Sequence, residues 1–108
     1  MEELAQRSDA EIIKAVIGGD SEAYRDILVR YQRQVFACAR SASGSHADAS
    51  DITQEVFLRF FRNIEQFDTR RPLLPYLLTI AVNCSRNLYR SNKRLVFTED
   101  IAAAADAD

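Results

Sequence analysis

The chain has 108 residues, of which 47% are hydrophobic and 28% are charged, and its formal net charge is −2. This length supports one modest hydrophobic core, and the composition is that of an ordinary globular protein. No apolar run approaches the roughly 20 residues needed to cross a bilayer, and the acidic N-terminus is unlike a secretory signal. We therefore expect a single cytoplasmic domain without a membrane segment.

Residues that commonly carry catalysis or bind metals are sparse. Cys38 and Cys84 are far apart and have no metal-binding spacing, and His46 is the only histidine. The sequence contains no glycine-rich phosphate loop and no Ser/His/Asp set. We predict that the protein is not an enzyme, that it has no metal or other cofactor, and that both cysteines belong to the core.

Charge is distributed unevenly along the chain. Residues 1–58 carry a net charge of −4, residues 59–97 carry +6, and residues 98–108 carry −4. No acidic residue lies between Asp68 and Glu99. A basic segment within a near-neutral protein can bind a polyanion such as nucleic acid while the rest of the chain does not.

Two helices are predicted in the first half of the chain. Ser8 to Glu11 matches a capping box, which predicts a short helix that ends at Gly18-Gly19. Asp20 or Ser21 then caps a longer helix that extends to about Ser41. The expected apolar stripes comprise Ile12, Ile13, Val16 and Ile17 in the first helix, and Tyr24, Ile27, Leu28, Tyr31, Val35 and Ala39 in the second.

The second half predicts two more helices and a loop. An amphipathic helix begins after Asp48 and runs into a basic loop, and the last helix starts near Pro72 or Pro75 and continues to about Arg94. No segment alternates like a half-buried strand. We expect an all-α, compact helical bundle of about four helices over residues 1–97, with no sheet, and an acidic, alanine-rich linker or disordered tail over residues 98–108. The expected buried side chains are Ile52, Val56, Phe57, Phe60, Phe61 and Ile64, followed by Leu77, Ile80, Ala81, Cys84 and Leu88.

One side of the third helix carries residues that folding does not require. Its members are spaced three and four residues apart and therefore share a face. Such a face is either a solvated helix side or a docking surface for a partner. The residues are Asp51, Gln54, Glu55 and Leu58.

The basic segment carries a second such surface, on the last helix and the loop before it. The helix presents a stripe of amides and arginines that is either a solvated face or a surface for phosphates and base edges. The loop combines cations with apolar and aromatic groups, which suits unstacked bases. The stripe comprises Asn83, Arg86, Asn87, Arg90 and Arg94, extended by Lys93, and the loop contributes Arg70, Arg71, Leu73 and Tyr76.

Several strings in this chain resemble the N-terminal domain, region 2, of the extracytoplasmic-function (ECF) sigma factors of bacterial RNA polymerase. DASDITQEVFLRFFRNIEQFD is similar to that family's acid-x-x-Q-E-V-F helix and its phenylalanine-acid loop. PYLLTIAVNCSRNLYRSNKR is similar to its W-L-x-x-I-A-x-N helix, with Tyr76 in place of the usual tryptophan. GGDSEAYRDILVRYQRQVF resembles the family's opening segment, so the resemblance covers roughly residues 9–94.

The resemblance implies a sigma factor domain that binds core RNA polymerase and recognises and helps to melt the promoter −10 element. Docking on the clamp coiled coil of the largest polymerase subunit would use Asp51, Gln54, Glu55 and Leu58, with Arg59 and Arg62. The non-template single strand would contact Arg70, Arg71, Leu73 and Tyr76 in the loop, and Asn83, Arg86, Asn87, Arg90, Lys93 and Arg94 on the helix. An anti-sigma factor is a further partner that the resemblance suggests.

Two readings from other functional classes remain open at this point. The chain could be a helical protein-interaction module, which needs only the face around Gln54 and Glu55, or a duplex DNA-binding regulator that acts without polymerase. The second domain of the sigma factor family, a helix-turn-helix, has no counterpart in these 108 residues. We therefore expect the chain to be a truncated form or a domain fragment.

Overall fold

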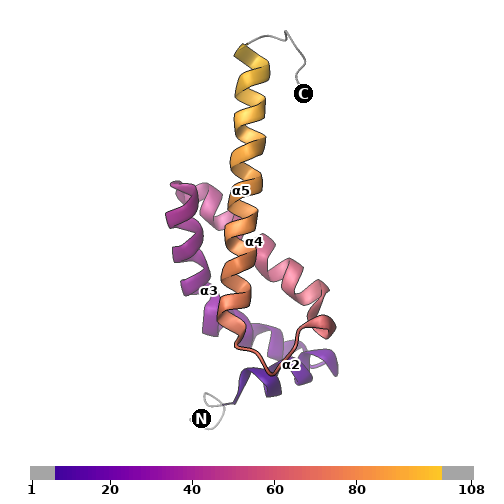
Figure 1. Ribbon diagram of the computed structural model, residues 1–108. Helices are drawn as coiled ribbons and strands as arrows, with labels where there is room; N and C mark the ends of the chain where they lie inside the picture. Colours follow the sequence, from indigo (N-terminus) through magenta and orange to yellow (C-terminus); the bar gives the residue numbers. More distant parts are fainter. Residues whose placement is uncertain (1–6, 101–108) are drawn as a thin grey trace.

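The computed structural model describes residues 7–100, and within that range the chain forms four α-helices and one 3-10 helix, with no β-strand (Figure 1). The α-helices are α2 (Asp9–Ile17), α3 (Ser21–Ser43), α4 (His46–Arg62) and α5 (Leu73–Asp100), and the 3-10 helix η1 (Ile64–Gln66) follows α4. α3 packs against each of the other α-helices, and α4 also packs against α5. The predicted all-α bundle is confirmed.

The first two helices begin at side chains that satisfy backbone N–H groups with no partner inside the helix. Ser8 and Glu11 form the predicted capping box. Ser8 Oγ accepts from the Glu11 N–H at 3.1 Å, and Glu11 Oε1 accepts from the Ser8 N–H at 2.9 Å. Asp20 caps α3 by accepting a hydrogen bond from the Glu22 N–H at 3.0 Å. Both helices therefore start where the sequence predicts.

α4 begins earlier than its sequence suggests. Gly44 ends α3 with a φ of 79°, a left-handed conformation that favours glycine, and its N–H donates to the Arg40 carbonyl at 2.9 Å. Ser45 caps α4 immediately afterwards, with its Oγ accepting from the Asp48 N–H at 3.1 Å. Because one glycine and one serine complete the turn, the polar residues from His46 to Asp48 are helical rather than loop.

α5 starts at Leu73, directly after Pro72, as the two prolines predict. Its end differs from the prediction, because the helix continues past Arg94 to Asp100 and includes the first residues of the expected tail. The rest of that tail, residues 101–108, lies outside the described part of the chain, as do residues 1–6.

Phe60 on α4 lies at the centre of the core and has no exposed surface. Its ring contacts the ring of Phe67 edge to face, with the centroids 6.0 Å apart. The core draws on every helix and on the loop after η1, so the predicted apolar stripes are largely confirmed. Its fully buried large side chains are Phe60, Ile12, Ile13, Ile27, Leu73, Leu77, Val35 and Val56.

Two members of the predicted stripes lie at the surface instead. Ile17 is 47% exposed and Tyr24 is 41% exposed. The ring of Tyr24 packs edge-on against Phe61 at a centroid distance of 4.6 Å, which accounts for the part that is buried. Both residues border a shallow hollow beside η1 at the end of the bundle, where no helix of the described chain covers them.

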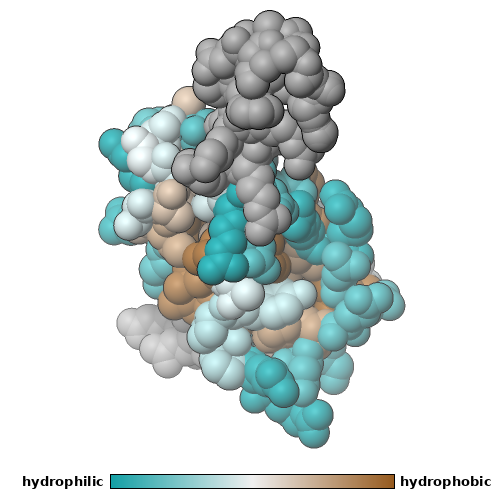
Figure 2. Space-filling model, turned by 45° about the horizontal axis from the view of Figure 1, so that its top comes forward, coloured by the Kyte–Doolittle hydropathy of each residue, from teal (hydrophilic) through white to brown (hydrophobic). Residues whose placement is uncertain are grey.

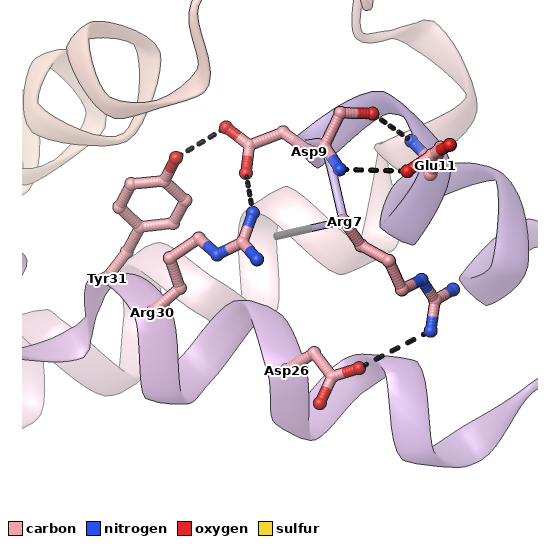
Figure 3. Close-up of polar contacts among 7 residues, drawn as sticks. Arg7, Asp9, Glu11, Asp26, Arg30 and Tyr31 are labelled. Atoms are coloured by element: carbon pink, nitrogen blue, oxygen red, sulfur yellow. Dashed lines mark hydrogen bonds and ion pairs between the residues drawn. The ribbon is translucent and has the colours of Figure 1, made fainter. Parts of the chain in front are cut away.

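A polar cluster around Asp9 holds α2 on α3 (Figure 3). One carboxylate oxygen of Asp9 accepts from Arg30 Nη1 at 2.9 Å, and the other accepts from the Tyr31 hydroxyl. Ile12 and Ile13 of α2 are each only 1% exposed. α2 is therefore attached both by apolar burial and by charge-assisted hydrogen bonds.

Burial, reinforced by the hydrogen bond to Asp9, raises the pKa of Tyr31 to about 12. Because the unfolded phenol has a pKa near 10, folding is favoured by this neutral phenol below about pH 10, and that contribution is lost as the pH rises toward 12. We expect Tyr31→Phe to lower the free energy of unfolding by about 1 kcal/mol at neutral pH. The variant should also lose less stability than the parent between about pH 10 and pH 12. Urea denaturation across this range measures both effects, and equal alkaline losses in the two proteins would contradict the assignment.

The predicted core placement of the cysteines is confirmed for Cys84, which is buried, whereas Cys38 is only partly buried. Burial raises the pKa of the Cys84 thiol, which keeps it protonated near neutral pH. None of the helices in residues 7–100 has the length and apolar character needed to cross a membrane.

Candidate functional site

The exposed side of α4 presents the surface that the sequence singled out. Asp51, Gln54 and Leu58 are exposed, and Leu58 keeps 53% of its surface in contact with solvent. A leucine this open contributes little to the core, and a single exposed leucine is ordinary on a protein surface. Its position beside a groove is what makes it a candidate contact for a partner.

Gln54 and Leu58 form part of a groove of about 670 Å³ between α3 and α4. Five of the ten side chains that line the groove are apolar or aromatic and five are polar, a composition that fits another protein's helix. On the face drawn in Figure 2, hydrophobic surface is visible between hydrophilic side chains. The α4 wall comprises Ser50, Thr53, Gln54, Phe57, Leu58 and Phe61, and the α3 wall comprises Leu28, Gln32, Arg33 and Phe36.

The α3 wall is the part of this site that sequence reasoning missed. Leu28, Gln32 and Phe36 recur at four-residue spacing, so they lie along one side of α3. Leu28 and Phe36 are only partly buried, although both pack against the core. The four-residue spacing therefore indicates that these residues share one side of α3. It does not reveal that the neighbouring helix α4 leaves a groove along this side.

Glu55 and Arg59 are oriented differently from Gln54 and Leu58. Arg59 Nε donates to Glu55 Oε2 at 2.8 Å, and each side chain is about two-fifths exposed. Both line a smaller cleft of about 360 Å³ between α4 and α5, together with Asp51 and Asn87. The structure thus divides five of the six residues predicted for docking between two neighbouring grooves.

Arg62 belongs to neither groove. It is exposed at the last turn of α4 and borders the hollow beside η1 that also contains Tyr24. Of the six residues predicted for docking, only Gln54 and Leu58 therefore line the large apolar groove.

The loop between η1 and α5 is a tight turn organised by Asp68. Its Oδ1 accepts from the Arg70 backbone N–H and from Arg70 Nε, both at 3.0 Å, and its Oδ2 accepts from Arg70 Nη2 at 3.1 Å. The Asp68 carbonyl accepts from the Arg71 N–H, also at 3.0 Å. The side-chain and backbone hydrogen bonds from Arg70 lower the pKa of Asp68 to about 2, so the carboxylate is charged at neutral pH. The two arginine side chains are 89% and 79% exposed.

An aromatic cluster adjoins this turn. The ring of Tyr76 lies with its centroid 4.8 Å from that of Phe67 and 6.1 Å from that of Phe60, and 36% of the residue is exposed. Leu73, which the sequence grouped with Tyr76 as a base contact, is only 1% exposed. Its side chain faces the core because it occupies the first, inward-facing position of α5. The geometry therefore favours Tyr76, not Leu73, as the residue that reaches a ligand.

The predicted basic face lies further along α5, after Tyr76. Asn83, Arg86 and Asn87 are exposed, while Cys84 and Ser85 between them are buried. Ser85 satisfies its hydroxyl by donating to the Ala81 carbonyl at 2.9 Å. Arg90, Lys93 and Arg94 continue along α5, but their side chains lie outside the described part of the structure. The arginines of the loop and the described part of this stripe can attract a polyanion.

Comparison with known proteins gives a consistent match. The Sigma-70 region 2 family model matches residues 27–95, which include most of α3, all of α4, the loop and the described stripe of α5. The chain is 35% identical over 81 residues to the ECF RNA polymerase sigma factor SigW of Bacillus subtilis, covering 75% of this chain and 43% of that protein. It is 33% identical over 98 residues to the ECF RNA polymerase sigma-E factor of Haemophilus influenzae and 30% identical over 98 residues to that of Escherichia coli. Each of the last two alignments covers 91% of this chain and 51% of the relative, so the chain spans about half the length of these proteins.

Proposed function

The chain belongs to the Sigma-70 region 2 family, as the region 2 domain of an ECF sigma factor, and we propose that it binds core RNA polymerase and engages promoter DNA during transcription initiation. In this proposal α4 docks on the clamp coiled coil of the largest subunit. The loop after η1 and the basic face of α5 hold the non-template strand of the −10 element. The protein acts in the cytoplasm as a binding factor and not as an enzyme.

The groove between α3 and α4 is the observation that carries the polymerase half of the proposal. A coiled coil buries its a and d side chains between its own helices and presents its other, largely polar and charged, positions outward. A groove with polar lining residues and an exposed leucine can receive one such helix along its length. Leu58 supplies the exposed aliphatic anchor and Gln54 a hydrogen-bonding group beside it. Asp51 and the Glu55–Arg59 pair lie on the neighbouring cleft, where their charges can set the orientation of the partner.

The proposed binding of promoter DNA rests on capture of an unstacked base by the loop. Taking a base out of a duplex costs roughly a few kcal/mol, which a protein recovers by stacking and hydrogen bonding to the exposed base. Tyr76 offers a partly exposed ring backed by Phe67 and Phe60, and the preceding loop offers two exposed cations, Arg70 and Arg71. Strand separation then proceeds by binding energy, with no covalent step.

We expect the double variant Gln54→Ala, Leu58→Ala to bind core RNA polymerase about tenfold more weakly, which corresponds to a combined loss of about 1.4 kcal/mol from the two truncated contacts. Both side chains are exposed, so the melting temperature of the variant should stay close to that of the parent. Titration of labelled protein with core polymerase measures the affinity.

Val29→Ala is the matched control for this experiment. Val29 is a 72% exposed aliphatic residue on α3 that does not line the groove. Its truncation should leave polymerase affinity unchanged. If the folded double variant binds as tightly as the Val29 control, docking does not occur through this groove.

A further inference from the structure

Asp68 is an acid in the middle of a surface proposed to hold nucleic acid. It is the only acidic residue between Glu65 and Glu99, and it lies between the aromatic Phe67 and two exposed arginines. Considered only as a charge, it weakens the attraction of this loop for phosphate. Its hydrogen bonds indicate another role.

Both ends of the loop are fixed in the core, because Phe67 is 9% exposed and Leu73 is 1% exposed. Between these anchors, Asp68 supplies the side-chain acceptor for the Arg70 N–H, and its own carbonyl accepts from the Arg71 N–H. These two hydrogen bonds close a turn over residues 68–71. The direction in which both arginines leave the backbone therefore depends on Asp68.

The side-chain contacts of Asp68 also orient the guanidinium of Arg70. Two of its nitrogens, Nε and Nη2, donate to the two carboxylate oxygens in a forked pair. Arginine has rotatable bonds whose freedom is lost when it binds, so a side chain held in place beforehand loses less on binding. The donors of Nη1 are not used by Asp68 and can be offered to a phosphate.

We propose that Asp68 is a positioning residue, which shapes the loop and presents Arg70 so that a single strand is held with its base at Tyr76. This inference rests on the proposed function, because it concerns the same loop. It adds that the turn made by this carboxylate, and not the cations alone, determines how well bases are recognised.

Two substitutions separate the turn from the charge. Asp68→Asn keeps a side-chain oxygen that can accept from the Arg70 N–H, whereas Asp68→Ala removes it, and both variants gain one unit of positive charge. Glu65→Ala is the matched control, since it makes the same change of charge at an exposed residue three positions earlier that is outside the turn. Thermal melts of all three establish that each is folded.

The binding experiment compares two single strands of about 12 nucleotides, one with mixed bases and one with the same backbone but abasic, in the presence of core polymerase. The ratio of the two affinities reports base recognition at constant phosphate charge. We expect Asp68→Ala to lower this ratio about two- to tenfold, the range corresponding to one hydrogen bond. Asp68→Asn keeps the acceptor for the Arg70 N–H but loses the forked pair to the guanidinium, so its ratio should fall between those of Asp68→Ala and the parent. Glu65→Ala should stay within about twofold of the parent.

A second readout needs neither DNA nor polymerase. Trypsin cleavage of the Arg70–Arg71 bond in the folded chain should be fastest in Asp68→Ala and slower in Asp68→Asn, with cleavage after Arg62 and Arg86 as internal references. Equal cleavage rates and equal affinity ratios for the alanine and asparagine variants would overturn the positioning role. A parent protein that does not prefer the base-bearing strand would instead overturn the proposed function, and the cleavage rates would still test the turn.

Discussion

Phe60→Ala lowers the free energy of unfolding by about 3–5 kcal/mol, the usual cost of removing a fully buried phenylalanine ring. The residue has no exposed surface, and its ring lies beside those of Phe61, Phe67 and Tyr76. Truncation leaves a cavity that these packed neighbours fill only in part. Because small domains are stable by only about 5–15 kcal/mol, a loss of this size removes much of the total.

Urea denaturation followed by far-ultraviolet circular dichroism measures this loss, with the slope checked for two-state behaviour. Leu58→Ala, two residues away on the exposed side of α4, is the control and should change stability by less than about 0.5 kcal/mol. A loss below about 1 kcal/mol for Phe60→Ala would mean that the buried side of α4 has been assigned wrongly.

Tyr76→Ala is expected to reduce promoter melting by the reconstituted holoenzyme, by an amount equivalent to about 1–3 kcal/mol for one base stacked on an aromatic ring. The ring carries no charge, so the salt dependence of binding should be almost unchanged. Opening is followed by the fluorescence of 2-aminopurine placed in the non-template strand, over a series of salt concentrations.

Two control variants distinguish stacking on the Tyr76 ring from attraction to phosphate. Tyr76→Phe keeps the ring and should restore melting, because stacking needs only the aromatic face. Arg86→Ala should show the opposite pattern, with weaker binding and a salt slope lower by about one unit, since it removes an exposed cation. Equal losses of melting and of salt-sensitive binding in Tyr76→Ala would contradict base capture by this ring. A preference for duplex that core polymerase does not alter would favour a duplex-binding regulator.

Much of the fold could be predicted from local rules. The capping box at Ser8 and the cap at Asp20 gave correct helix starts, and the stripe through Ile52, Val56 and Phe60 gave the buried side of α4. These features depend on hydrogen bonds and periodicity within a few residues. The end of α5 could not be predicted in this way, because the polar residues around Arg94 fit a helix and a linker equally well.

The candidate site was less accessible to sequence reasoning, because it is made by contacts between elements. Periodicity places Leu73 beside the loop, but only the packing of α5 shows that its side chain enters the core. Glu55 and Gln54 are adjacent in the sequence, yet an ion pair with Arg59 holds the first beside α5 while the second lines the groove to α3. Helical spacing gives a shared face, and only the neighbouring helices divide that face between two grooves.

The two prolines at the start of α5 have a consequence for how this end of the molecule handles anions. A helix N-terminus ordinarily offers several unpaired N–H groups, which make it a natural seat for a phosphate. Pro72 precedes the first residue of α5 and Pro75 is its third, and neither has an N–H to donate. Of the four N–H groups usually free at this end of a helix, only those of Leu73 and Leu74 remain, so the backbone is a weakened phosphate site and the guanidinium groups of Arg70 and Arg71 supply further donors. Their removal leaves only these two amides to compensate, so binding of the sugar-phosphate chain at this point depends on arginine and is sensitive to salt.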